Sequence, residues 1–417
     1  MASTNSAAAG ASPAEAAAWL LTPDAVRERA HLILRLGEAG SLAHFALRLD
    51  RLPAAAEYVL ATIRRNYPDL AIPFHSRWRH FAVGGRDRWA MLARELGHLS
   101  AAERARIRFD LAVTSVLLDA GAGAAWRYRE PGGGEYARSE GLAVASFHLF
   151  RSGLFSDDPA RACRADAAAL ARLDAAALAE GMQVGAANPL TGIEGRALLL
   201  RRLGAALTQQ PALFGAEARI GHLFDHLRGA AVAGRLPAAA LLAAVLRGFG
   251  AIWPGRESLA GVPLGDVWRH SRAEAADASR GLVPFHKLSQ WLAYSLIEPL
   301  EEAGIAVTDC DALTGLAEYR NGGLFLDLGV IEPRDPDLPR RALAVGEEAI
   351  VEWRALTVAL LDRLAAALRA RLGLDAVRLP LAKVLEGGTW AAGRRIAGEK
   401  RPDGEPPLRI ESDGTVF

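Results

Sequence analysis

The residues best suited to chemistry lie between 285 and 323, where a lysine and a carboxylate stand among apolar and aromatic residues. The segment reads FHKLSQWLAYSLIEPLEEAGIAVTDCDALTGLAEYRNGG and carries Lys287 and Glu318 in two successive helical patterns. A charge buried in such surroundings is costly unless it is paired or used in function. We therefore expect the fold to bring these two side chains together on one surface. A salt bridge is the alternative to a catalytic pair.

A second concentration of functional side chains occupies residues 72–89, IPFHSRWRHFAVGGRDRW. Guanidinium groups bind phosphate through two hydrogen bonds, and neighbouring indole or imidazole rings can hold a planar group or a ribose. The glycine pair that follows allows backbone N–H groups to approach a ligand. The pattern suits an anion site made by His75, Arg77, Trp78, Arg79 and His80. The alternative is a solvated basic loop with two buried tryptophans.

The motif NPLTGIEGR places Asn188 before a helix that contains Arg196. The N-terminus of such a helix could receive a carbonyl or a phosphate. A full phosphate-loop pattern is missing, so a capped turn with Arg196 in an ion pair is the preferred interpretation.

Two motifs repeat a carboxylate followed two residues later by an arginine. LAEYRNGG, with Glu318, Tyr319 and Arg320, is expected to end a short helix at its glycine pair, and VEWR, with Glu352 and Arg354, stands at the head of an amphipathic helix. Taken alone, each pair favours a salt bridge over a catalytic group.

Metal, nucleophile and cofactor motifs have little support. His222 and His226 are one helical turn apart, but no third ligand is apparent, so surface histidines are the preferred interpretation. The two cysteines, Cys163 and Cys310, have no CxxC spacing, and neither GxSxG nor GxGxxG occurs. We expect no metal and no cofactor.

The elements that must position these residues are mainly helical. TPDAVRERAHLILRLGE begins with Thr22 as a cap and Pro23 as the first helical residue, and apolar residues then recur every three or four positions. The same pattern predicts helices over 54–66, 100–119, 164–181, 196–207, 236–248 and 352–373. Residues 125–139 predict a small hairpin, 325–339 a connection without helix, and the tail from 398 a short β-like end.

Composition excludes several classes of function. The 49 basic and 48 acidic residues leave a formal charge of +1, which argues against nucleic-acid binding and favours a small polar or phosphorylated ligand. No window is apolar over the length that a membrane span requires, and the few cysteines fit a cytoplasmic protein. Residues 1–15 read as a flexible Ala/Ser leader.

Several long motifs resemble a known family, the uracil-catabolism proteins of the ribosylurea pathway. They are IPFHSRWRHF, RSEGLAVASFHLF, NPLTGIEGR, PFHKLSQW, LTGLAEYRNGG, GTWAAGRRIA and SDGTVF, and they cover nearly the whole chain. The resemblance implies a ribosyl or nucleotide-like substrate and a GTP-cyclohydrolase-II-like enzyme as functional partner. It also makes Phe147 and His148 candidate substrate contacts.

From about residue 146 the order of motifs is similar to the queuosine-salvage nucleotide hydrolases, which cleave an N-ribosyl bond. Their FYKRAQ, FADYR and VEIR motifs match FHKLSQ, LAEYR and VEWR. The match implies a helical, DNA-glycosylase-like body over 146–417, after an N-terminal helical region over 16–145. It carries the family's lysine onto Lys287, with Phe285 and Gln290 beside it, and the catalytic aspartate onto Glu318. The glutamate departs from the pattern, which puts the substrate pose in doubt.

Together the two resemblances imply hydrolysis of the N-ribosyl bond of ribosylurea or its 5′-phosphate, with urea as the leaving group. Glu318 would stabilise the oxocarbenium-like sugar, and Lys287 would pair with it or contact the sugar. Two alternatives remain open. One is a hydrolase of an opened pyrimidine ring or acyl-urea bond, and the other is a non-catalytic partner that binds an intermediate for the cyclohydrolase-like enzyme.

Overall fold

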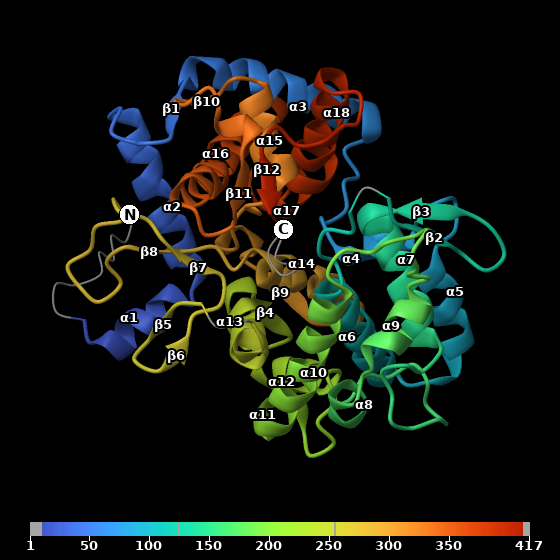
Figure 1. Cartoon of the computed structure of the whole chain (residues 1–417). Coiled ribbons are helices and arrows are strands. Elements are labelled where there is room, and N and C mark those ends of the chain that lie inside the picture. Colours follow the sequence, from blue (N-terminus) through green and yellow to red (C-terminus); the bar gives the residue numbers. More distant parts are fainter. Residues whose placement is uncertain (1–10, 124, 254–255, 412–417) are drawn as a thin grey trace. The chain divides into compact units, whose positions relative to one another are not determined.

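The computed structural model describes residues 11–123, 125–253 and 256–411, and it is mainly α-helical (Figure 1). The chain divides into two compact units, each assembled from separate stretches. The described part of unit 1 is 11–74, 256–290 and 309–411, and that of unit 2 is 75–123, 125–253 and 291–308. The predicted boundary at residue 146 falls inside one helix of unit 2.

Unit 1 is built around one long helix, α16 (Glu348–Leu372). Helices α2 (Pro23–Glu38), α3 (Leu52–Asn66) and α15 (Tyr319–Asp327) pack on it. Sixteen of its residues are buried, including Trp353 and Leu360, so α16 is apolar on several faces and forms the centre of the core. The remaining helical elements are α1 (Pro13–Leu20), 3₁₀ turns at 49–51, 310–312 and 338–340, α17 (Leu381–Val384), a π-helical turn (Leu385–Thr389) and α18 (Trp390–Lys400).

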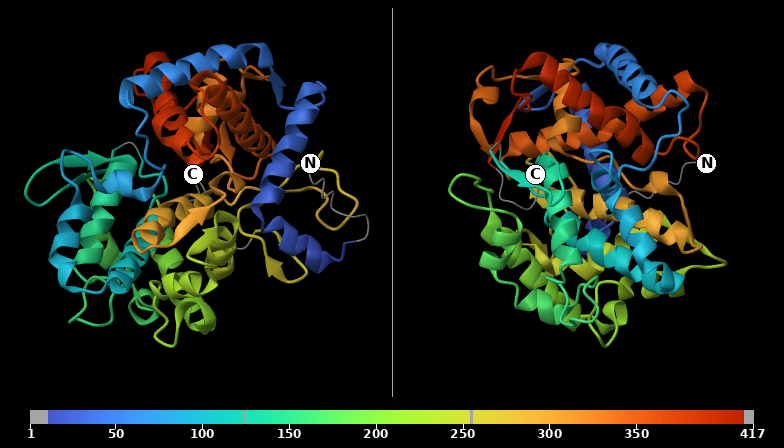
Figure 2. Two further views of the ribbon diagram at one scale, coloured as in Figure 1. Left: turned by 180° about the vertical axis from the view of Figure 1, so that it is seen from behind. Right: turned by 90° about the vertical axis from the view of Figure 1, so that its right-hand side faces the viewer.

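Short strand pairs fasten the loops of unit 1. β1 (Phe45–Leu47) pairs antiparallel with β10 (Ile331–Pro333), and β7 (Val267–Arg269) pairs antiparallel with β8 (Leu282–Pro284). The other pairs are β5 (Ser258–Leu259) with β6 (Val262–Pro263), antiparallel, and β11 (Ala342–Ala344) with β12 (Arg409–Glu411), parallel. The last pair confirms the β-like tail, whereas the SDGTVF motif lies outside the described residues. Both views of Figure 2 show α3, in blue, beside the red C-terminal helix α18.

Unit 2 packs its helices around α6 (Ala101–Leu117) and α10 (Ile193–Gln209). Its other helical elements are α4 (Arg77–Phe81), α5 (Arg88–Glu95), a 3₁₀ turn at 96–98, α7 (Arg138–Arg151), α8 (Ala167–Ala171), α9 (Ala175–Gly181), α11 (Pro211–Phe214), α12 (His222–Ala230), α13 (Ala238–Phe249) and a 3₁₀ turn at 250–252. β4 (Arg235–Pro237) pairs parallel with β9 (Ala306–Thr308). Helix α14 (Lys287–Glu302) starts in unit 1 and continues in unit 2.

Most local predictions are confirmed. Thr22 caps α2 by accepting a hydrogen bond from Ala25 N at 3.1 Å. The hairpin forms between β2 (Arg127–Arg129) and β3 (Glu135–Ala137), and the glycines of its loop have positive φ angles that other residues rarely adopt. In the part of the chain that the structure describes, no helix combines the length and apolar character needed to cross a bilayer.

Three local predictions are wrong. The helix expected over 164–181 is two helices. The first, α8, ends at Ala171, and after a short turn Asp174 caps α9 by accepting a hydrogen bond from Ala176 N. The segment 325–339 begins inside α15 and includes β10. The glycine pair at 322–323 does not end a helix either. It lies inside α15, where a Cβ on Gly322 would fall 2.7 Å from the Trp353 ring, so the glycine is needed for packing.

Candidate active site

Glu318 is the N-cap of α15. Its two carboxylate oxygens accept hydrogen bonds from Arg320 N at 2.7 Å and Asn321 N at 2.6 Å. A helix N-terminus stabilises a negative charge, since its first N–H groups lack partners within the helix. The side chain is half-buried, so the structure holds a carboxylate in one orientation at the start of a helix. The same geometry also explains Glu318 as a purely structural cap.

Lys287 is the first residue of α14 and is half-buried. The residue before it, His286, has a φ of 49°, in the left-handed region that non-glycine residues seldom occupy. The His286 ring donates or accepts through Nε2 at 2.8 Å from the carbonyl of Leu20, and since a carbonyl only accepts, the proton belongs on Nε2. Burial lowers the pKa of His286, so this ring is neutral at neutral pH. The neutral ring thus fixes a strained turn immediately before the lysine.

Asp266, which the sequence analysis missed, connects the two ends of the site. Its carboxylate accepts from Arg354 Nη1 and Nη2 at 2.8 and 2.9 Å, from Trp268 Nε1 at 2.6 Å and from the backbone N of Lys287 at 2.9 Å. Burial alone would raise the pKa of Asp266, but the Arg354 charge and these hydrogen bonds hold it below its usual value. The aspartate is therefore ionised.

Arg354 carries the connection on to Glu318. Its Nε donates to the carbonyl of Ala317, the residue before Glu318, at 3.3 Å, and its guanidinium lies 4.0 Å from the centre of the Phe285 ring. A continuous path thus runs from Lys287 N through Asp266 and Arg354 to the backbone at Glu318. The Asp266–Arg354 ion pair in the middle of this path is nearly inaccessible to solvent.

Gln290 and Thr314 form a second tie between the same two segments. Thr314 N donates to Gln290 Oε1 at 2.9 Å, and Gln290 Nε2 donates to the hydroxyl of Thr314 and to Phe285 O. Both side chains are fully buried. The amide of Gln290 therefore serves the fold, since its oxygen and nitrogen both have protein partners.

Glu352 and the remaining residues of this region have mainly structural partners. Glu352 is completely buried and accepts from Phe45 N at 2.9 Å, His44 N at 3.2 Å and the His270 ring at 3.3 Å. Arg320 donates to Gly404 O at 2.7 Å and lies 5.0 Å from the Tyr319 ring. The roles of these residues toward a substrate stay predictions.

The predicted anion cluster lies in unit 2. Arg77 is fully buried, donates to Asp119 at 2.8 Å and to Ser115 Oγ at 2.6 Å, and burial lowers its pKa. Arg79 pairs with Glu298 at 2.6 Å, and Trp78 Nε1 donates to Ser295 O. The rings of His75 and His80 lie 6.2 and 5.8 Å from that of Trp291. Two of the arginines are thus engaged by carboxylates, which is what a structural interpretation expects of them.

The other residues predicted in unit 2 also have protein partners. The His148 ring lies 2.9 Å from Glu130, and Phe147 packs on Phe81. Asn188 exchanges hydrogen bonds with the backbone of Arg127 and so extends the hairpin. The expected ion pair of Arg196 is not found among the described residues: Arg196 donates to backbone carbonyls at 118, 120, 121 and 191, and burial lowers its pKa to about 10.

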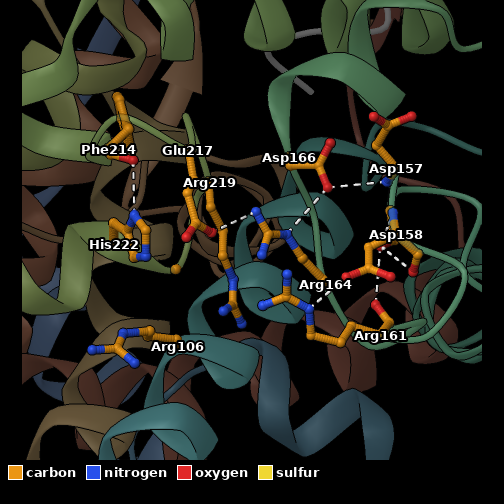
Figure 3. A network of polar contacts seen from close by, with 12 residues as sticks. Arg106, Asp157, Asp158, Arg161, Arg164, Asp166, Phe214, Glu217, Arg219 and His222 are labelled. Atoms are coloured by element: carbon orange, nitrogen blue, oxygen red, sulfur yellow. Dashed lines mark hydrogen bonds and ion pairs between the residues drawn. The ribbon is translucent and has the colours of Figure 1, made fainter.

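A further polar network of unit 2 is centred on Arg164 and Asp166, and His222 lies to one side of it (Figure 3). Arg164 donates to Asp166 at 3.2 Å and pairs with Glu217 at 2.9 Å, while Arg219 pairs with Asp110 and Glu103. His222 Nδ1 donates to Phe214 O, and the His226 ring contacts Arg247. Within the described residues, no group of three or more His, Cys, Asp or Glu side chains is arranged to hold a metal.

Comparison with known proteins places the chain in a family. Residues 19–417 match the model described as "Protein of unknown function (DUF1688)". The chain belongs to this family. It is also 40% identical over 408 residues to "Uracil catabolism protein 4" of Lachancea kluyveri, covering 90% of this chain and 92% of that protein. "Protein urg3" of Schizosaccharomyces pombe is 40% identical over 414 residues, which covers 97% of this chain and 99% of the relative. The resemblance to the uracil-catabolism proteins, stated from the sequence, is confirmed.

Proposed function

We propose that this family member acts in uracil catabolism by hydrolysing the N-ribosyl bond of ribosylurea or of its 5′-phosphate, releasing urea. The name of the relative from Lachancea kluyveri supports the pathway. The resemblance of FHKLSQ, LAEYR and VEWR to motifs of N-ribosyl hydrolases supports the reaction. A GTP-cyclohydrolase-II-like enzyme is the proposed source of its substrate.

The observation that carries the proposal is the hydrogen-bonded path from Lys287 N through Asp266 and Arg354 to the carbonyl of Ala317. Three segments that the motif resemblance singles out meet along this path: FHKLSQ, LAEYR and VEWR. If Glu318 were only a helix cap, its hydrogen bonds to the N-terminus of α15 would be sufficient. The additional buried ion pair behind it is what a site needs to hold a carboxylate and a lysine in fixed positions.

In the proposed reaction a water oxygen attacks the anomeric carbon as the bond to the ureido nitrogen breaks. The bonding electrons go to that nitrogen, and a proton from the water completes urea, so the products are urea and the free sugar or sugar phosphate. The sugar carries positive charge in the transition state. Glu318 stabilises that charge and orients the water, and the N–H groups of Arg320 and Asn321 keep the carboxylate in place during the step.

Lys287 is assigned to the sugar hydroxyls or to the phosphate, if one is present. Its position is set by the strained turn at His286 and by the bond from its backbone to Asp266. An ammonium group on a flexible stem suits such contacts as a point charge. Replacement by methionine should therefore raise KM more than it lowers kcat.

The direct test is to incubate the purified chain with ribosylurea and with its 5′-phosphate, and to measure urea and sugar by mass spectrometry. Release of urea with ribose or ribose phosphate supports the proposal. A three-carbon acid together with intact ribosylurea, from an earlier intermediate, would indicate cleavage of an acyl-urea bond instead. Ligand binding with no turnover until a cyclohydrolase-like enzyme is added would indicate a non-catalytic partner.

Glu318→Gln tests the carboxylate itself. We expect kcat to fall by about 100- to 1000-fold, in the range found when one transition-state stabiliser is removed. Asp174→Asn is the matched control, because Asp174 also caps a helix, α9, through a backbone N–H at 3.1 Å. The control should keep full activity. Full activity of Glu318→Gln would remove Glu318 from the mechanism.

A further inference from the structure

Asn321 is a buried side chain whose amide nitrogen has a hydrogen-bond partner, whereas its amide oxygen has none among the described residues. It lies in the first turn of α15 and is 0% exposed. Its Nδ2 donates to the carbonyl of Leu316 at 3.2 Å, and this fixes the amide orientation, because a carbonyl cannot donate. Its Oδ1 is also buried, and no described residue donates a hydrogen bond to it. Leaving such an acceptor without a donor costs about 1–3 kcal/mol.

Thr389 presents a second buried group of the same kind. It is 0% exposed, and its hydroxyl has no hydrogen-bond partner among the described residues. Buried threonines on helices elsewhere in the chain donate to a carbonyl four residues earlier, as Thr62 does to Tyr58 O at 3.1 Å. Thr389 closes a π-helical turn, where this local geometry is altered. Such turns are frequent at functional sites.

The two groups lie on elements that pack against each other within unit 1. The π-helical turn leads into α18, and both contact α15. Gly393 follows Thr389 by one helical turn and so shares its face. A Cβ at Gly393 would fall 2.2 Å from the carbonyl oxygen of Arg320, the residue before Asn321. The helical face that Thr389 shares with Gly393 therefore meets α15 at the turn that carries Asn321 and is capped by Glu318.

The chemistry of this pair selects its ligand. An amide oxygen accepts and cannot donate, so it repels a phosphate and favours a group with N–H bonds. A hydroxyl can donate to a carbonyl beside those N–H bonds. We propose that Asn321 and Thr389 bind the uncharged ureido end of the substrate, with Asn321 Oδ1 accepting from its N–H and the Thr389 hydroxyl donating to its carbonyl. This proposal rests on the proposed function, because it names the part of the ribosylurea that is held next to Glu318.

Isosteric replacements test it. Asn321→Leu and Thr389→Val remove the polar atoms while keeping the branched shape of each side chain, and Thr62→Val is the matched control for loss of a buried hydroxyl. Binding is measured by calorimetry in the Glu318→Gln background, with ribosylurea and with ribose 5-phosphate. We expect each variant to weaken ribosylurea binding about 5- to 10-fold, the effect of one lost hydrogen bond, and to leave ribose 5-phosphate binding unchanged.

The outcomes separate this proposal from the function on which it rests. If wild-type protein releases urea and both variants bind ribosylurea as tightly as their parent, the ureido site is wrong and the function stands. If wild-type protein binds ribosylurea without turnover but the variants lose that binding, the site stands and the reaction is wrong. Equal ribosylurea binding together with lowered stability of Thr389→Val would identify a buried structural water as the only occupant and would overturn the ureido site.

Discussion

Two buried aspartate–arginine pairs, one in each unit, have opposite acid–base character. Asp266 in unit 1 receives both arms of Arg354, the Trp268 indole and a backbone N–H, and its pKa lies below the usual value. Asp110 in unit 2 accepts hydrogen bonds from the Arg219 guanidinium and from Gly221 N, and Arg219 also donates to Glu103. Burial raises the pKa of Asp110 to about 7, although Arg219 opposes this. The two pairs differ in the hydrogen-bond donors that contact the carboxylate: Asp266 has four donors of its own, whereas Asp110 shares its arginine with Glu103.

An ion pair at comparable distances therefore does not by itself keep an aspartate charged. Removing a carboxylate from water costs several kcal/mol, and one shared guanidinium offsets only part of that cost. At Asp266, four hydrogen-bond donors, two of them uncharged, outweigh the effect of burial and keep the pKa low. We therefore expect the unit 1 pair to behave as a fixed charge and the unit 2 pair to respond to pH near neutrality.

Arg354→Met should have the largest effect on stability. It leaves the ionised Asp266 buried without its counter-charge, which typically costs about 3–5 kcal/mol. Denaturant unfolding at pH 7 measures the loss. The double variant Asp266→Asn, Arg354→Met removes both charges and should recover part of it. A loss below about 1 kcal/mol would show that the pair is not what holds these three segments together.

The pH dependence of unfolding should distinguish the two aspartates by sign. The folded pKa of Asp110 is raised, so its contribution to stability is fully present below about pH 4 and is lost as the pH rises through about 7. The folded pKa of Asp266 is lowered, so its contribution is present above about pH 4 and is lost as the pH falls below that value. Each pKa unit corresponds to about 1.4 kcal/mol.

Asp110→Asn and Asp266→Asn, unfolded in urea at several pH values, check this assignment. Asp110→Asn should flatten the decline in stability between pH 4 and 7 and leave the acid limb as it is. Asp266→Asn should flatten the acid limb alone. If both variants flatten the same limb, donor number is not what sets the two aspartates apart.

Arg219→Met should cost less than Arg354→Met, about 1–3 kcal/mol at pH 6. Asp110 can take up a proton when its counter-charge is removed, and Glu103 keeps Arg106 as a partner at 2.9 Å. The cost should grow between pH 6 and 8, where Asp110 is increasingly ionised. Unfolding measured at both values tests the trend, and an equal cost at pH 6 and 8 would contradict it.

Trp268→Phe should have the smallest effect, about 1.5 kcal/mol. It removes one neutral donor to a charged acceptor and keeps most of the ring packing against Gly346. The acid limb of the stability curve should also shift to slightly higher pH, because Asp266 loses one of its four donors. A loss of stability without that shift would mean that Trp268 acts by packing alone.

Local structure was largely predictable from the residues. The cap at Thr22, the glycine hairpin and the mainly α architecture depend on interactions within a few positions of the chain. The glycine pair after Asn321 misled, because its role is to let α15 approach Trp353 and not to end a helix. The resemblance to the uracil-catabolism proteins predicted the family correctly, whereas the residues that the motif resemblances assign to the site stay predictions.

Asp266 could not be found from the sequence because its partners are distant along the chain. It lies 21 positions before Lys287 and 88 before Arg354, in a stretch, GDVWRH, that matches no motif. The Asn321 oxygen and the Thr389 hydroxyl were equally hidden in the sequence, because only the fold shows that no described residue forms a hydrogen bond with either atom. The amino-acid pattern was enough to predict most of the helices, the cap at Thr22 and the family. Which charges are buried together depends on the three-dimensional fold, because the donors that set the state of a buried carboxylate come from segments that are distant along the chain.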